Sequence, residues 1–125
     1  MKEVIPNIAE ISMINNFILR IKFLPKTNIG VEAAKKIVDA SKRVSQNLKH
    51  CNLVDTRDML FMDRDARKYF AEQDRSEIVA VGVVIHSKFQ KALSNLYLKV
   101  SKPILPTKMF HDEDDAIVWL NSMMG

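Results

Sequence analysis

The amino-acid sequence predicts one α/β domain over residues 1–125, built on a mainly parallel sheet. Residues 8–24 alternate apolar and polar side chains, which indicates a β-hairpin. Residues 31–48 change to a helical period, and short apolar runs then alternate with helical patterns. Because strands joined by helices form right-handed crossovers, this alternation favours parallel strands. The expected order is ββαβαβαβα, with the hairpin adding one antiparallel edge strand.

The first half of the chain gives three clear elements. The hairpin is expected to turn at Asn15 and Asn16, and its apolar positions are Ala9, Ile11, Met13, Phe17, Leu19, Ile21 and Phe23. The helix over residues 31–48 has an inward stripe at Ala34, Ile37, Val38, Ser41, Val44 and Leu48. Residues 50–55, with the sequence HCNLVD, then form a short strand.

The second half continues the alternation. A helix is expected to begin near Arg64, with Asp63 as the N-cap that accepts hydrogen bonds from its free amides. Residues 78–85 form an uninterrupted apolar run, typical of a strand buried on both faces. Ser87 is expected to cap the next helix, whose inward positions are Phe89, Leu93, Leu96, Tyr97 and Val100.

The chain is expected to end with one more strand and one more helix. The strand covers residues 107–111, and Asp112 caps the helix after it. The inward positions of this helix are Ala116, Trp119, Leu120 and Met123.

Composition argues against several functional classes. Hydrophobic residues make up 47% of the chain and charged residues 27%, as in ordinary globular domains. The net charge of +4 is spread out, without a basic run that contains aromatic residues, so nucleic-acid binding is not expected. No leader or membrane span is recognised, and a cytoplasmic protein is predicted. With three glycines, the chain fits neither glycine-rich phosphate-binding motif, and no cofactor is predicted.

Several residues allow both a structural and a chemical interpretation. His86 and His111 follow strands and would meet Asp55 in a zinc site, but their spacing favours ordinary strand ends. Cys51 is expected to be a buried core residue rather than a nucleophile. The acidic residues 112–115 suit a helix N-terminus better than a cation site.

The segment LVDTRDMLFMDRDAR resembles part of the STAS domain, the fold of SpoIIAA-like anti-sigma-factor antagonists. In that family a strand ends at an Asp, and the motif FMDSSG then starts a helix, where a partner kinase phosphorylates the second serine. Here Phe61, Met62 and Asp63 match, whereas Arg64 and Asp65 replace the two serines. The resemblance implies a STAS-like fold with helices mostly on one side of the sheet. It also implies that the usual phosphorylation cannot occur.

The C-terminal part resembles an uncharacterised bacterial offshoot of STAS/SpoIIAA-like proteins. These proteins have a K-P-x-x-P-T-x-x-F element followed by A-x-x-W-L. The matching residues are Lys102, Pro103, Pro106, Thr107, Phe110, Ala116, Trp119 and Leu120. Together with the order of elements, the resemblance covers about residues 8–123.

The resemblance implies a non-enzymatic, regulatory protein-interaction domain. Its strand-to-helix corner would meet a protein partner, for which an anti-sigma-type regulator is the class that the family suggests. The predicted partner-binding residues are Arg57, Asp63, Arg64, Asp65, Arg67 and Lys68. Asp65 is interpreted as a first-turn helix residue, with a permanent mimic of phosphoserine as the alternative.

Two other functions compete with this interpretation. A module that binds a lipid- or nucleotide-type small molecule would use a pocket lined by Phe17, Phe61, Phe89 and Tyr97. A hydrolase would use Ser87 with a histidine, but no G-x-S-x-G motif supports it. A homodimer is also predicted, because the hairpin edge and the apolar strand need to be covered.

Overall fold

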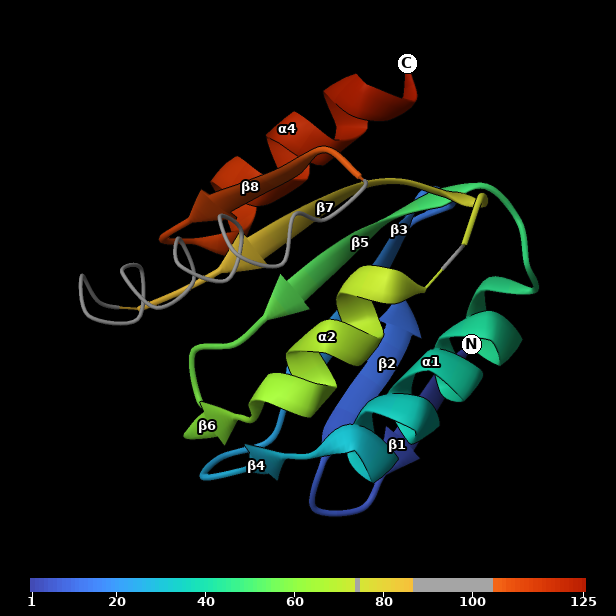
Figure 1. The fold of residues 1–125 in the computed structure, drawn as a ribbon. Coiled ribbons are helices and arrows are strands. Elements are labelled where there is room, and N and C mark those ends of the chain that lie inside the picture. Colours follow the sequence, from blue (N-terminus) through green and yellow to red (C-terminus); the bar gives the residue numbers. More distant parts are fainter. Residues whose placement is uncertain (74, 87–104) are drawn as a thin grey trace.

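The computed structural model describes residues 1–73, 75–86 and 105–125. Its centre is a six-stranded sheet in the order β1-β2-β3-β5-β7-β8, and a small separate ladder joins β4 to β6 (Figure 1). The strands are β1 Lys2–Ile5, β2 Ala9–Met13, β3 Ile18–Phe23, β4 Asn28–Ile29, β5 His50–Asp55, β6 Phe61–Met62, β7 Ile78–Val84 and β8 Thr107–Phe110. The described helices are α1 Val31–Ser45, α2 Arg64–Glu72 and α4 Glu113–Met124.

The sheet is mainly parallel, as predicted. Strands β3, β5, β7 and β8 run parallel, and β2 runs antiparallel to both of its neighbours. The hairpin turns where predicted, since the side-chain oxygen of Asn15 accepts hydrogen bonds from the amides of Phe17 and Ile18 at 2.7 and 2.9 Å. The prediction that the hairpin forms the edge of the sheet was wrong, because β1 pairs with β2 and lies outside the hairpin. Strand β1 has four residues, KEVI, too few for a clear alternation.

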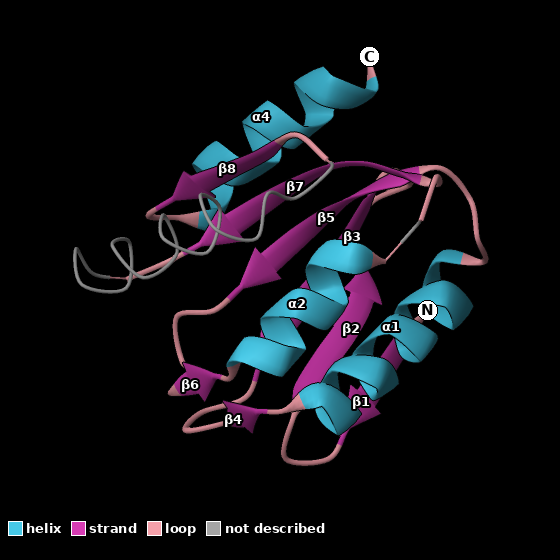
Figure 2. Ribbon diagram, viewed as in Figure 1, coloured by secondary structure: helices cyan, strands magenta, loops and turns pink. Residues whose placement is uncertain are grey.

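Helices cover both faces of the sheet (Figure 2). Helices α1 and α2 pack on the face that carries Ile21 and Phe23. Helix α4 packs through Leu120 on the opposite face, against Leu53 and Val84. Two of the three described helices thus share one face, in line with the arrangement that the resemblance implied, and α4 covers the other face. The physical reason is that β5 and β7 also direct apolar side chains to the second face, and α4 buries them.

Helix α1 ends earlier than predicted. The inward stripe is buried up to Val44, but Leu48, which was assigned to the same stripe, is 64% exposed. The backbone at Gln46 and Asn47 is left-handed, with φ of 55° and 56°. Such residues terminate a helix, so Leu48 leaves the stripe.

Strand β7 has one buried and one half-buried face. Alternate residues from Ile78 to Val84 are buried, whereas Val81 and Val83 on the other face are half-buried. Burial on both faces was predicted, but the second face borders a cavity. The helix predicted after Ser87 lies outside the described residues. In the described ranges, no helix is long and apolar enough to cross a membrane.

Candidate functional site

The carboxyl ends of β3 and β5 carry a charged network centred on Asp55, which is 2% exposed. Its carboxylate accepts hydrogen bonds from Arg57, from the backbone amide at 3.1 Å, Nε at 3.0 Å and Nη2 at 2.8 Å. Nη2 of Arg20 lies 3.7 Å from the same carboxylate and 2.6 Å from Oε1 of Glu113 at the start of α4. Nζ of Lys22 lies 3.9 Å from Asp55. The network therefore ties two strands to α4.

The surroundings of Asp55 keep it ionised. Burial opposes ionisation of the carboxyl group, but hydrogen bonds from Arg57 outweigh burial and lower the pKa of Asp55 to about 2. The same contact raises the pKa of Arg57. A group that titrates this far from neutral pH is poorly suited to general acid–base catalysis. The geometry of Asp55 is that of a structural charge cluster.

This network determines where Arg57 lies. Asp55 shares a strand face with Cys51 and Leu53, which pack on α4. Arg57 also approaches Glu113, with 3.6 Å between its Nη2 and the carboxylate Oε1. The structure thus places Arg57 on the α4 side of the sheet. Helix α2, which carries the other predicted partner-binding residues, packs on the opposite side.

Asp63 caps α2, as predicted. Its Oδ1 accepts a hydrogen bond from the amide of Ala66 at 2.8 Å, and its backbone is extended. The amide of Asp63 donates to the carbonyl of Ile29 at 3.0 Å. A Cβ added at Gly30 would lie 3.3 Å from Oδ2 of Asp63, so the start of α1 also packs on this carboxylate. These contacts give Asp63 a structural role at the corner.

We expect Asp63→Ala to lower the free energy of unfolding by about 0.5–2 kcal/mol, because the first turn of α2 loses its cap. Asp65→Ala is the matched control, since Asp65 is an exposed first-turn residue and should contribute a few tenths of a kcal/mol. Urea unfolding measures both. Equal midpoints for Asp63→Ala and the unmodified protein would contradict the capping role.

The predicted residues on α2 separate into two groups. Arg64, Asp65 and Lys68 are exposed, and Arg64 and Lys68 are neighbours one helical turn apart. Arg67 is half-buried and lines a cavity between α2 and the sheet. The structure therefore brings Arg64, Asp65 and Lys68 together on the surface, and it turns Arg67 inward.

Two exposed apolar side chains precede α2 and were not predicted as partner-binding residues. Leu60 is 66% exposed and Phe61 is 56% exposed. Their amides donate to the carbonyl of Thr27 at 2.9 and 3.2 Å, and Phe61 pairs with Asn28 in the small ladder. These bonds hold the backbone of both residues in place, while their side chains stay largely exposed. The available signal was the apolar run MLFM between two aspartates, too short for a core strand.

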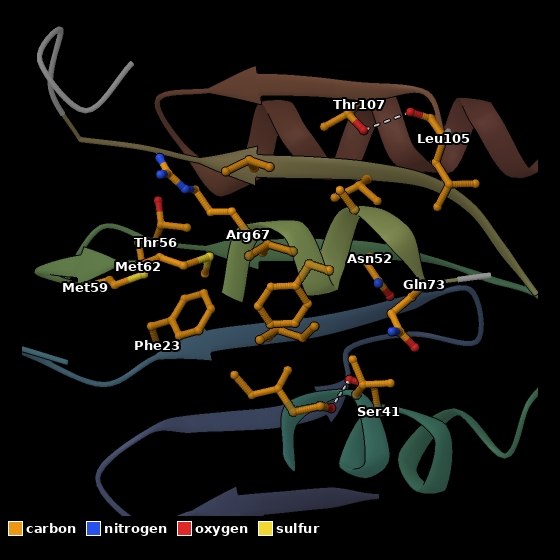
Figure 3. Close-up of a pocket in the computed structure, with 18 of the residues that line it drawn as sticks. Phe23, Ser41, Asn52, Thr56, Met59, Met62, Arg67, Gln73, Leu105 and Thr107 are labelled. Atoms are coloured by element: carbon orange, nitrogen blue, oxygen red, sulfur yellow. Dashed lines mark hydrogen bonds between the residues drawn. The ribbon is translucent and has the colours of Figure 1, made fainter. Parts of the chain in front are cut away.

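A cavity of about 280 Å³ lies on the sheet face that carries α1 and α2 (Figure 3). Val54 and Val83 form part of its floor, and Phe70 of α2 forms part of its wall. Phe61, one of the predicted pocket residues, lines it. Phe17, another of them, is 49% exposed at the end of the hairpin turn. Phe89 and Tyr97 lie outside the described residues.

The remaining candidate residues have structural environments. Cys51 is buried, its thiol donates to the carbonyl of Leu120 at 3.7 Å, and burial raises its pKa. His50 is also buried; Nδ1 lies 2.7 Å from the carbonyl of Leu48, and burial lowers the pKa of the imidazole. Across the described ranges, no group of three or more His, Cys, Asp or Glu side chains could hold a metal ion.

Comparison with known proteins agrees with this architecture. The family described as a domain of unknown function, DUF7793, matches residues 12–124. The chain belongs to the DUF7793 family. This DUF7793 chain is similar to the crystal structure of an uncharacterised DUF3478 protein from Shewanella loihica PV-4, which has a SpoIIAA-like fold. The two are 16% identical with a TM-score of 0.66, over 96% of this chain and 98% of the other. The predicted SpoIIAA-like fold is confirmed. The curated proteins include no match.

Proposed function

We propose that this DUF7793 domain is a non-enzymatic regulatory domain that binds a protein partner through the corner surface, defined as Leu60, Phe61, Arg64, Asp65 and Lys68. The observation that carries the proposal is the exposure of Leu60 and Phe61, whose amides both donate to Thr27, just before the exposed charges of α2. Protein interfaces combine an apolar or aromatic centre with a polar rim. A partner with an apolar contact and acidic side chains would complement this surface.

The chemistry of the buried groups supports a non-enzymatic role. The carboxylate of Asp55 is surrounded by cations, and burial raises the pKa of the Cys51 thiol. Asp65 occupies the position of the serine that is phosphorylated in the SpoIIAA-like STAS proteins, and it has no hydroxyl group to accept a phosphate. Partner binding would therefore be regulated without that phosphorylation.

We expect Arg64→Glu with Lys68→Glu to abolish recovery of the partner from a lysate of the source cells. The double variant should change the free energy of unfolding by less than about 1 kcal/mol, because exposed charges contribute little to stability. Lys36→Glu with Lys42→Glu is the matched control, since it makes the same charge change on the exposed side of α1. Quantitative mass spectrometry of the recovered proteins provides the measurement.

The pattern of recovery across the variants decides whether the partner uses the corner surface. A protein that is lost with the corner variant and kept with the α1 variant identifies a partner that uses the corner surface. Phe61→Asp should lose the same protein, because it places a charge at the apolar centre. Equal recovery by all variants would remove the support for the corner surface.

The single-domain extent, the cytoplasmic location and the homodimer stay predictions. The outer strand β1 now provides the edge that a second copy would cover, and Val4 on it is 53% exposed.

A further inference from the structure

The cavity on the α1–α2 face is mostly apolar. Its walls come from β3, β5, β7, β8, the two helices and the loop before α2. In Figure 3, Thr56, Met59 and Met62 lie toward one end, and Asn52 and Gln73 lie toward the other. The volume of about 280 Å³ is near the lower limit of ordinary ligand pockets. The cavity therefore suits a small apolar molecule.

The charged residues of the lining have one sign. Arg67 and Arg75 line the cavity, whereas no described aspartate or glutamate does. Within residues 1–73, 75–86 and 105–125, no carboxylate lies within ion-pairing distance of Arg67. In Figure 3 its guanidinium extends from α2 to the end of the cavity that holds Thr56. A negative group on a ligand would complement this charge.

The opposite end contains a buried donor without an acceptor. Arg75 is 6% exposed, and its Nε donates to Oε1 of Glu77 at 2.6 Å. Its Nη2 is buried and has no hydrogen-bond partner. Arg75 lies just before β7, and its carbonyl accepts a hydrogen bond from the amide of Ile78 at 3.1 Å. This places it by the amino ends of the strands, whereas Thr56 follows the carboxyl end of β5. Because this atom is fully covered by protein, a ligand in the cavity does not contact it, and Arg67 supplies the charge that a ligand can reach.

We propose that the cavity binds a small apolar carboxylate. The carboxylate accepts hydrogen bonds from Arg67, and the apolar body lies along Val54 and Val83. This site is distinct from the charged part of the corner surface, since Arg64 and Lys68 do not line the cavity.

Calorimetric titration of the full chain with octanoate and octanol tests the proposal. Octanoate should bind about tenfold or more tightly than octanol, as expected for one charge-assisted hydrogen bond. Arg67→Gln should abolish the preference for octanoate over octanol. Lys68→Gln removes the same charge from an exposed neighbouring position and should retain that preference.

A cavity-filling variant separates the cavity from surface binding. Ala71→Leu places a larger side chain in the lining of α2 without changing a charge, and it should weaken binding of both compounds at least tenfold. Circular dichroism checks that each variant is folded. The proposal is overturned if no compound binds, if octanol binds as tightly as octanoate, or if Ala71→Leu leaves the affinities unchanged.

Discussion

Asp55→Asn is expected to lower the free energy of unfolding by about 2–4 kcal/mol at neutral pH. The substitution keeps the shape of the side chain but removes the negative charge that Arg57, Arg20 and Lys22 surround. Breaking a fully buried ion pair typically costs about 3–5 kcal/mol. The expected loss is somewhat smaller because the side chains of Arg57 and Arg20 are 36% and 25% exposed, so water can solvate them.

The pH dependence distinguishes this charge effect from a packing effect. The pKa of Asp55 is about 2 in the folded protein and about 3.9 in an unfolded chain. Ionised Asp55 therefore stabilises the fold fully above about pH 5, and this contribution is lost as the pH falls through about 2. The difference between the unmodified protein and Asp55→Asn should thus be largest near neutral pH and shrink between about pH 4 and 2.

Urea unfolding at several pH values measures this difference. Asp58→Asn is the matched control, because the side chain of Asp58 is 48% exposed and lies 3.9 Å from Lys22. It should change the free energy of unfolding by less than about 1 kcal/mol. A difference for Asp55→Asn that is the same at pH 7 and pH 2 would show that its charge does not stabilise the fold.

The elements that the sequence predicted well are those with long or strongly marked patterns. The alternation around Ile21, the helical stripe of α1 and the capping aspartates Asp63 and Asp112 all correspond to observed structure. Each of these signals is local, since burial on one face or a free helix end is determined within a few residues. Strand β1 was missed because its four-residue pattern is too short and includes two charges.

The candidate site was less predictable because side-chain direction depends on distant partners. Arg57 lies two residues from Asp55 in sequence, but its position also reflects Glu113, which belongs to the last helix. Arg67 and Lys68 are adjacent and equally charged, but the phase of α2 turns one to the cavity and the other to the surface. The cavity itself joins four strands of the main sheet and two helices, and no single segment carries its signature.

Leu120→Ala is expected to lower the free energy of unfolding by about 2–5 kcal/mol, the range for buried leucines. Helix α4 has two buried residues, Ala116 and Leu120, and Leu120 is the larger of them. Its side chain packs over Gly82, where an added Cβ would lie 3.3 Å from Cδ1 of Leu120 and 3.4 Å from its Cγ. Gly82 therefore leaves the space that Leu120 fills, and truncation of Leu120 opens a cavity between α4 and β7.

A double-mutant cycle tests this complementarity. Gly82→Ala alone should be neutral or destabilising, because its methyl group meets Leu120 at a distance tighter than ordinary contact. In the Leu120→Ala background the same methyl group has room, and alanine is favoured over glycine in a strand by about 0.5–1 kcal/mol. The two substitutions should thus be non-additive, with the double variant more stable than the sum of the single effects. Additive effects in urea unfolding would show that Gly82 and Leu120 do not share this space.

A loss below about 1 kcal/mol for Leu120→Ala would mean that other contacts hold α4 on the sheet.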